Sequence, residues 1–378
     1  MLHLNLPLPS FRSARNLVLG ENAIMSLRSL ESSRVVVVTS RSFAANTKLF
    51  DKFLKNIRAH TIEVVEKSWS EDVTLMCLEP ALRRIEAFQP DTIIAVGGGA
   101  VIDASKILWL FYEHPDLPKE SLHKPNWVPP LRGRSRFVAI PTTTGTGSEV
   151  SSSAIFFSEE EKRKVAVVSH EFLPDLVVLD PQLLVDLPRD IMIATACDAL
   201  AHCIEGYVSR LVNPLMDSFA EKATQMIFSA WRDAIECRSP QQIEKLQYAA
   251  TMGGWVQNHC LAGGAHAIAH QLGQFGVSHG VANSILLPAV IRRNSLDTEV
   301  AEKYARLSGL CGLSPNAQAL ANELEELVAN ARFPVSLRHF GVSGFADIVE
   351  GAILDPSAKS NPVEVDEQYV VEILERCQ

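Results

Sequence analysis

The sequence predicts two domains of different class, an α/β domain followed by an all-helical domain. The chain has 378 residues, more than a single hydrophobic core usually organises, so two domains are the natural expectation. Short β-rich runs alternate with amphipathic stretches in the first half, and beyond Leu187 the strand-like runs give way to a 3.6-residue periodicity. We therefore expect an α/β domain at 1–187 and an all-helical domain at 188–378.

Strand and helix patterns alternate along the first domain in the order that βαβ units require. Strands are expected at 34–40, 61–66, 92–96 and 137–140, and helices at 43–57, 73–88 and 101–113. Strands separated by helical patterns of this length favour a parallel sheet covered on both faces. A basic, proline-rich segment at 123–136 is expected to form a surface loop, and the runs at 153–157 and 165–168 a hairpin.

The second domain shows helical periodicity and no run that resembles a strand. Amphipathic patterns are clearest at 191–208, 216–235 and 243–259. No repeat of fixed period and no low-complexity tract interrupts them. An all-helical domain is therefore expected here.

Composition excludes several classes of function. Hydrophobic residues make up 47% of the chain and charged residues 21%, as in ordinary globular proteins, and the apolar runs are too short to span a membrane. The net charge of -9 opposes binding to a nucleic-acid backbone. Seven scattered cysteines without a CxxC pair, and no signal-like amino terminus, favour a reducing cytoplasm.

A glycine-rich loop follows the strand at 92–96. In the run Gly97, Gly98 and Gly99, unpaired amides at the start of a helix would face a ligand, and the missing Cβ atoms would let a phosphate approach. Asp103 lies on the first turns of that helix. The alternative is a tight turn between strand and helix that binds nothing.

A second loop rich in glycine and threonine follows the strand at 137–140. Loops at the ends of parallel strands converge on one crevice, so the two loops together predict a dinucleotide-binding domain. The alternative is a Ser/Thr turn whose hydroxyl groups satisfy the local backbone. The residues expected to contact the cofactor here are Thr142, Thr143, Thr146, Ser148 and, further along, Lys164.

The loop after the strand at 34–40 bears on which dinucleotide is used. Dinucleotide-binding folds usually place an acidic residue here to bind the ribose hydroxyls, whereas this chain has Thr39, Ser40 and Arg41. Without a carboxylate, a 2′-phosphate would not be repelled, and Arg41 could pair with it. We expect Ser40 to lie at the cofactor and both NAD(H) and NADP(H) to be tolerated.

Aspartate and histidine residues gather in the second domain with helical spacing. Asp198 and His202 are four residues apart in an apolar stretch, which places both on one helix face. His266 and His270 repeat this spacing, and His279 follows. Any one of them could be a hydrogen-bonded core residue, but together they form a donor set suited to Fe²⁺, Zn²⁺ or Mn²⁺.

These motifs resemble the iron-containing (group III) alcohol dehydrogenase family, within the dehydroquinate-synthase-like fold. The resemblance covers nearly the whole chain and is carried by GGGAVIDASK (97–106), PTTTGTGSEV (141–150), DALAHCIEGYVS (198–209) and GGAHAIAHQLGQFGVSHGVANSILLP (263–288). The chain departs from the usual pattern at Ala100, at Ser40 and at 361–363, where a common Ser, a common Asp and an often present Arg are replaced.

The resemblance implies an NAD(P)-linked alcohol dehydrogenase with a metal in the cleft between its domains. It implies that the ligands of Fe²⁺, or of Zn²⁺, are Asp198, His202, His266 and His279. It also implies that His270 lies nearby without binding the ion, which suits a proton relay at neutral pH. We expect a cytoplasmic homodimer that acts on a small-molecule aldehyde or alcohol.

Two other functions stay open at this point. A lyase-type cyclase like dehydroquinate synthase would use bound NAD and a metal without releasing reduced product, and a non-catalytic protein could keep the fold as a scaffold. Among aldehydes, an anionic one such as phosphonoacetaldehyde is favoured by basic residues expected around the cleft-forming loops. These residues are Arg132, Arg134, Arg136, Lys162 and Lys164.

Overall fold

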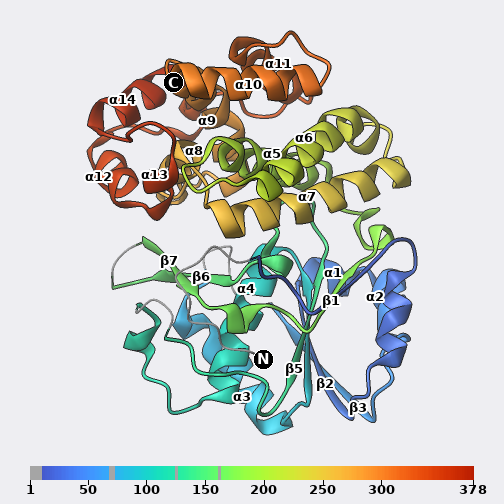
Figure 1. Cartoon of the computed structure of the whole chain (residues 1–378). Coiled ribbons are helices and arrows are strands. Elements are labelled where there is room, and N and C mark those ends of the chain that lie inside the picture. Colours follow the sequence, from blue (N-terminus) through green and yellow to red (C-terminus); the bar gives the residue numbers. More distant parts are fainter. Residues whose placement is uncertain (1–10, 68–72, 124–126, 161–162) are drawn as a thin grey trace.

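The computed structural model describes residues 11–67, 73–123, 127–160 and 163–378. Lys162, one of the basic residues considered above, lies outside them. Figure 1 shows a sheet with its helices in the lower half and a helical assembly above it. The α/β class of the first half and the helical class of the second are confirmed.

A parallel sheet forms the centre of the first half. Its strand order is β1-β8-β5-β4-β2-β3, and every neighbouring pair is parallel. The strands are β1 (Asn16–Leu19), β2 (Arg34–Thr39), β3 (Thr61–Glu66), β4 (Thr92–Gly97), β5 (Arg136–Pro141) and β8 (Leu176–Leu179). Because the direction of strand addition reverses between β2 and β4, the loops that follow these two strands border one crevice.

Side chains alternate between the two faces of this sheet. Val36, Val38 and Ile93 join the core beneath the helices α3 (Leu75–Phe88) and α4 (Gly99–Glu113). Val35 and Val37 face the opposite core, which is covered by α1 (Arg41–Ala45) and α2 (Thr47–Leu54). Strands buried on both faces explain the continuous valine run in the sequence.

The hairpin expected from the sequence lies beside α4. Its strands β6 (Ser153–Ser158) and β7 (Arg163–Val168) pair antiparallel, apart from the parallel sheet. Short 3-10 helices lie at Ala23–Ser29, Lys119–His123, Ser148–Val150, His170–Phe172, Pro181–Leu184, Leu272–Phe275 and Leu337–Phe340.

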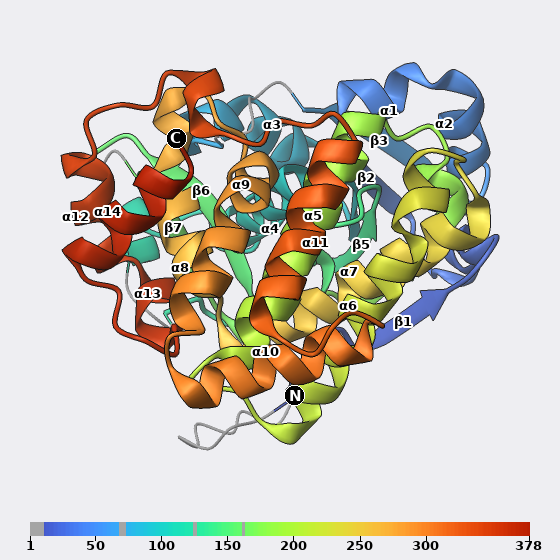
Figure 2. The ribbon, with the colours of Figure 1, turned by 90° about the horizontal axis from the view of Figure 1, so that it is seen from above.

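Helices make up the second half, and α5 (Arg189–Val208) lies at its centre against α6, α7 and α9. Figure 2 shows the other helices around α5, with α10 and α11 on the side away from the sheet. They are α6 (Pro214–Ile235), α7 (Pro240–Cys260), α8 (Gly264–Ala269), α9 (His279–Asn294), α10 (Thr298–Leu310), α11 (Ala317–Asn330), α12 (Ala346–Leu354), α13 (Pro356–Ser360) and α14 (Glu367–Arg376).

The helix α5 is apolar on nearly all sides. By length and composition it could cross a membrane, but 89% of the relevant window is buried inside the protein. A helix that is hydrophobic all round is a core helix when it is covered in this way. Polar side chains carried by α5 are therefore held in a dry interior, where each needs a partner.

Glycines bring the two halves into direct contact. A Cβ atom at Gly147 would lie 2.2 Å from the Cα atom of Gly254 on α7, and one at Gly145 would lie 2.3 Å from the carbonyl oxygen of Thr195 on α5. The hydroxyl of Thr195 also lies 3.0 Å from that of Thr144. One buried apolar cluster includes residues of both halves, so the division at residue 187 stays a prediction.

Candidate metal centre

Asp198 and His202 lie one turn apart on α5 and point to the same side. Their exposed fractions are 3% and 5%. The other two residues of the predicted set come from the elements packed against α5: His266 is on α8, and His279 is the first residue of α9. Gly280 allows this packing, because a Cβ atom there would lie 2.2 Å from the carbonyl oxygen of Ala194.

The four side chains converge on Oδ1 of Asp198. The Nε2 atom of His279 lies 3.4 Å from it, that of His266 3.6 Å and that of His202 4.0 Å. Ligand atoms bound at about 2.1 Å to a tetrahedral ion would be separated by about 3.4 Å. The ligand atoms of Asp198, His202 and His266 all lie within 4.8 Å of one another. His279 approaches the same carboxylate oxygen, and this mixed carboxylate and imidazole set fits Fe²⁺ or Zn²⁺.

The electrostatics of the cluster also suit a cation. Burial raises the pKa of Asp198, but the three histidines outweigh it and hold that pKa well below its usual range. Burial lowers the pKa of His202 to about 4, so its imidazole is neutral. Burial also lowers the pKa of His266, yet its hydrogen bonds to Asp198 and Glu205 raise it overall to about 10, so an ion bound at Nε2 would have to displace a proton from this ring. An ionised carboxylate and a neutral imidazole are the forms that bind metals.

Two residues that the sequence analysis did not single out contact this set. Glu205, also on α5, lies 2.5 Å through Oε2 from Nδ1 of His266. Asn283 on α9 donates from Nδ2 to Oδ1 of Asp198 at 2.9 Å and lies 3.2 Å from Nε2 of His279. Both are at most 1% exposed. Their spacing in the sequence could have identified them, because Glu205 is seven residues from Asp198 and Asn283 is four residues from His279. Residues at these spacings lie on the same face of a helix.

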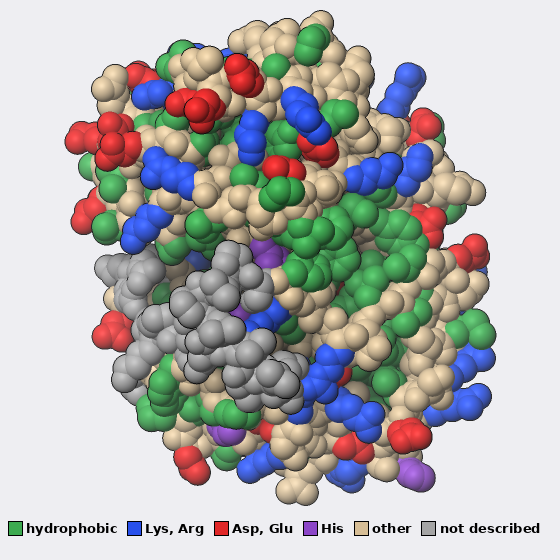
Figure 3. All heavy atoms as spheres, viewed as in Figure 1, with side chains coloured by type: hydrophobic (Ala, Val, Ile, Leu, Met, Phe, Trp, Pro, Cys, Tyr) green, Lys and Arg blue, Asp and Glu red, His purple; other side chains and the backbone are tan. Residues whose placement is uncertain are grey.

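His270 lies beside the set, on its more open side. Its ring is parallel to that of His279, with centroids 5.1 Å apart, and its side chain is 24% exposed. The Nδ1 atom of His270 lies 2.8 Å from Oδ2 of Asp355, which precedes α13. Figure 3 shows a histidine side chain at the surface between the two halves.

The two glycine-rich loops touch each other, as expected from their positions after β4 and β5. A Cβ atom at Gly98 would lie 3.1 Å from the side chain of Thr143, and one at Gly99 would lie 2.7 Å from that of Thr146. The amide of Thr142 donates to the carbonyl of Gly97 at 3.0 Å. Close contact between the two loops is thus one reason for glycine at these positions, and room for a cofactor phosphate would be a second.

Asp103 and Ser148 are brought together by α4 and the second loop. The hydroxyl of Ser148 donates to Oδ1 of Asp103. Burial raises the pKa of Asp103, and the charges of Lys106 and Lys164 oppose that shift. Lys164, on β7, also lowers the pKa of His279 after the larger effect of burial. Lys164 therefore lies in electrostatic range of both the loop and the histidine cluster.

Ser40 directly follows the strand β2 and caps α1. Its Oγ atom accepts a hydrogen bond from the amide of Phe43 at 3.2 Å. Thr39 is paired in register with Val96, one residue before Gly97. Ser40 thus lies just beyond the end of the strand that pairs with β4, the strand from which the first glycine-rich loop continues.

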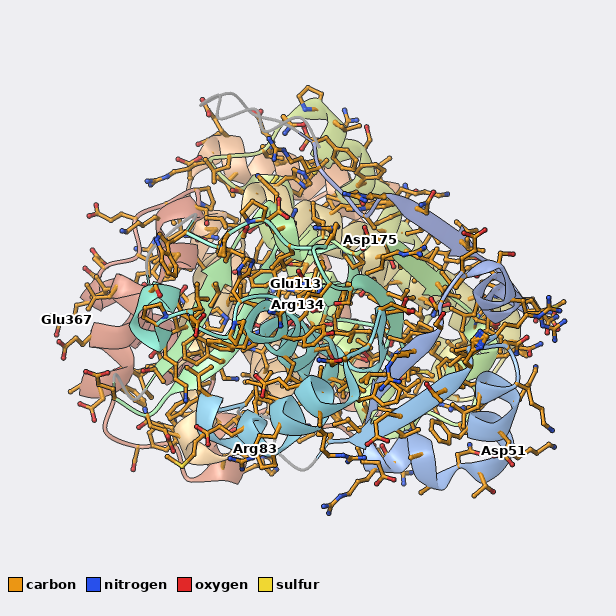
Figure 4. The ribbon with its side chains drawn as sticks, turned by 90° about the horizontal axis from the view of Figure 1, so that it is seen from below. Asp51, Arg83, Glu113, Arg134, Asp175 and Glu367 are labelled. Atoms are coloured by element: carbon orange, nitrogen blue, oxygen red, sulfur yellow. The ribbon has the colours of Figure 1, made fainter. Side chains whose placement is uncertain are left out.

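Three of the basic residues expected around the cleft lie elsewhere, so that expectation is wrong for Arg132, Arg134 and Arg136. Arg136 begins β5, whereas the second loop follows the end of this strand. Arg132 lies over the ring of Trp109 and pairs with Asp175, and Arg134 donates to the carbonyl of Tyr112. Figure 4 looks from the side opposite the helical half and labels Arg134 and Asp175 there.

Asn361, one of the departures from the family pattern, has a structural role. It is 1% exposed, and its Oδ1 atom accepts from the amide of Gly264 at 3.1 Å and from Nδ2 of Asn294 at 3.0 Å. This pairing fixes the start of α8, and with it the backbone that carries His266.

Comparison with known proteins matches both halves of the chain to one family. Residues 14–181 match the sequence family described as iron-containing alcohol dehydrogenase, and residues 192–378 match the family described as its C-terminal domain. The chain is 30% identical to the NADPH-dependent butanol dehydrogenase of Clostridium saccharobutylicum, over 97% of each protein. It is also 30% identical to a 1-propanol dehydrogenase of Salmonella typhimurium, over 97% of this chain and 99% of that protein.

A solved structure shares the whole fold. The iron-containing alcohol dehydrogenase from Thermococcus thioreducens superimposes with a TM-score of 0.89 at 27% identity, covering 97% of this chain and 99% of the other. The fold is therefore shared over nearly the whole length of both chains.

Proposed function

The chain belongs to the iron-containing alcohol dehydrogenase family and is an NAD(P)-dependent alcohol oxidoreductase, and from this premise we propose that it reduces short, uncharged aldehydes to primary alcohols with NADPH. The observation that carries the proposal is the convergence of Asp198 with the Nε2 atoms of three histidines beside two touching glycine-rich loops. Relatives named for butanol and 1-propanol support the choice of substrate.

The residues that would hold the ion are Asp198, His202, His266 and His279, and iron is the metal of this family. When bound, a divalent ion acts as a Lewis acid on the substrate oxygen. The chain contributes the site itself: Asp198 supplies the negative charge, and its burial at 3% exposure removes competing water. The amides of Gly98 and Gly99 at the start of α4 would receive the pyrophosphate of the cofactor.

His270 is the proposed proton carrier. Asp355 engages Nδ1 of its ring at 2.8 Å, so proton exchange falls to Nε2. We expect His270→Ala to lower kcat by about 10²-fold or more, since general acid-base groups contribute that much, while bound metal is retained. Metal content by mass spectrometry and aldehyde turnover measure the two effects. Wild-type turnover, or loss of the metal, would show that this role is wrong.

Cofactor preference depends on the side chain at position 40. We expect Ser40→Asp to raise the KM for NADPH by roughly 10–100-fold and to leave that for NADH nearly unchanged, because a carboxylate repels the 2′-phosphate. The helix cap at Phe43 is retained, since Asp caps helices as well as Ser does. Ser40→Asn is the uncharged control. Equal effects of both variants, or no shift in preference, would contradict the placement of Ser40 at the ribose.

A panel of aldehydes tests the function as a whole. The metal-loaded protein is mixed with NADPH or NADH, and absorbance at about 340 nm is followed with butanal, propanal, phosphonoacetaldehyde and sulfoacetaldehyde. We expect net consumption of NADPH, fastest with the uncharged aldehydes. Turnover of the anionic aldehydes alone would contradict the proposal of uncharged substrates and would identify anionic aldehydes as the substrate class. No net consumption with any of them would favour the cyclase or the scaffold over the dehydrogenase.

We also propose a homodimer in the cytoplasm. The edge strand β1 carries Leu19, which is 54% exposed, and the loop before α6 carries Leu211 at 52%. Open strand edges and exposed apolar side chains favour association. Light scattering after size-exclusion chromatography gives the mass, and a mass near one chain at micromolar concentration would contradict the dimer.

A further inference from the structure

Glu205 is the buried carboxylate that contacts the outer side of the proposed metal centre. It lies on α5, is 1% exposed, and was not part of the predicted site. We propose that Glu205 is a positioning residue, which holds the ring of His266 in the one tautomer and orientation that directs Nε2 toward Asp198. This inference rests on the proposed function, because it concerns how one of the proposed ligands is oriented.

Both oxygens of Glu205 are used on consecutive residues of α8. Oε2 lies 2.5 Å from Nδ1 of His266, and Oε1 accepts from the amide of Ala265 at 2.6 Å. The carboxylate thus fixes the backbone and the ring of the same turn. An ionised carboxylate only accepts hydrogen bonds, so the Nδ1 atom of His266 must carry the proton.

That proton decides which nitrogen can bind a metal. With Nδ1 protonated, the lone pair of a neutral His266 ring is on Nε2, the atom that lies 3.6 Å from Oδ1 of Asp198. Carboxylate partners on the far nitrogen of a histidine ligand raise its basicity and fix the ring. The pair therefore orients the ligand and strengthens it as a donor.

The loop before α8 is shaped for this carboxylate. A Cβ atom at Gly263 would lie 2.8 Å from Oε1 of Glu205, so any larger residue would displace the carboxylate. Gly264 is as constrained, because a Cβ atom there would lie 2.4 Å from the hydroxyl of Tyr369. The two consecutive glycines thus allow the backbone before α8 to approach the carboxylate of Glu205 closely.

The variant Glu205→Gln tests whether Glu205 orients the ring of His266 or only supports the fold. The amide keeps the size of the side chain but offers one acceptor to two donors, so either His266 or Ala265 loses its partner. We expect the dissociation constant for Zn²⁺, measured by competition with a chromophoric chelator, to rise about 10–100-fold. Cobalt-loaded protein should show altered d–d bands, because the ring of His266 is no longer held.

Glu113→Gln is the matched control. Glu113 is 7% exposed and accepts from three backbone amides, Gly133, Arg134 and Ser135, but none of its hydrogen bonds among the described residues is to a histidine. Figure 4 labels it beside Arg134 on the face opposite the helical half. The control should lower the melting temperature and leave zinc affinity unchanged. Wild-type zinc affinity in Glu205→Gln, or an equal loss in both variants, would overturn the positioning role.

A measurement on the wild-type protein keeps the proposal testable if Glu205→Gln does not fold. In zinc-loaded protein with ¹⁵N-labelled histidine, one slowly exchanging Nδ1 proton should show a nuclear Overhauser contact to the amide proton of Ala265. Its absence would overturn the proposal. If the wild-type chain bound no stoichiometric zinc, the proposed metal centre itself would fail, which is a separate outcome.

Discussion

Replacing His266 with alanine should leave the protein without stoichiometric metal and lower aldehyde turnover by about 10³-fold or more, because a Lewis acid contributes several kcal/mol to such a reaction. The variant removes one of three nitrogen donors that converge on Asp198. It also leaves Glu205, which is 1% exposed, without its ring partner. Metal per chain by mass spectrometry and NADPH oxidation measure the two losses.

His259→Ala is the control for this experiment. His259 is on α7, where its ring accepts from the amide of Arg12 and stacks on Phe11, apart from the metal set. The control should bind metal and turn over like the wild type. Stoichiometric metal together with aldehyde reduction in His266→Ala would show that the ligand assignment is wrong.

Much of the fold could be predicted because its strands are buried on both faces. Runs such as Val35–Val38 are unmistakable for that reason. The strands β1 and β8 are not evident from the sequence, since each has only four residues and lies in a segment without clear alternation. The expected helix at 43–57 is two helices, and Asn46, which caps the second through the amide of Leu49, was the signal for the break.

In the site, residues that share a helix could be predicted and residues joined only by the fold could not. Asp198 and His202 follow from spacing along α5. His270 and Asp355 are 85 residues apart in sequence, and no local pattern connects them. Arg136 illustrates the converse error: it is near a functional loop in sequence, yet β5 separates it from that loop by roughly 17 Å at the usual rise per residue.

Lys106 gives the largest expected loss of stability outside the metal set. It is 0% exposed, and its Nζ atom donates to the carbonyls of Ser148, Ser151 and Ser153 at 2.8, 2.8 and 2.7 Å. Burial lowers its pKa to about 8, against the opposing charge of Asp103. We expect Lys106→Met to cost about 3–5 kcal/mol, as when one partner of a buried ionic group is removed. The melting temperature should fall by roughly 5–10 °C.

A lysine with similar contacts at the surface tests whether burial is the cause. Lys303 donates to the carbonyl of Tyr207 at 2.7 Å and pairs with Asp217, but its side chain is 36% exposed. Lys303→Met should cost no more than about 1 kcal/mol, because solvent screens an exposed pair and water replaces the lost donor. Equal losses in the two variants would contradict the argument from burial. Since the three carbonyls bound by Lys106 lie in the second glycine-rich loop or just after it, Lys106→Met should also weaken NADPH binding, whereas Lys303→Met should not.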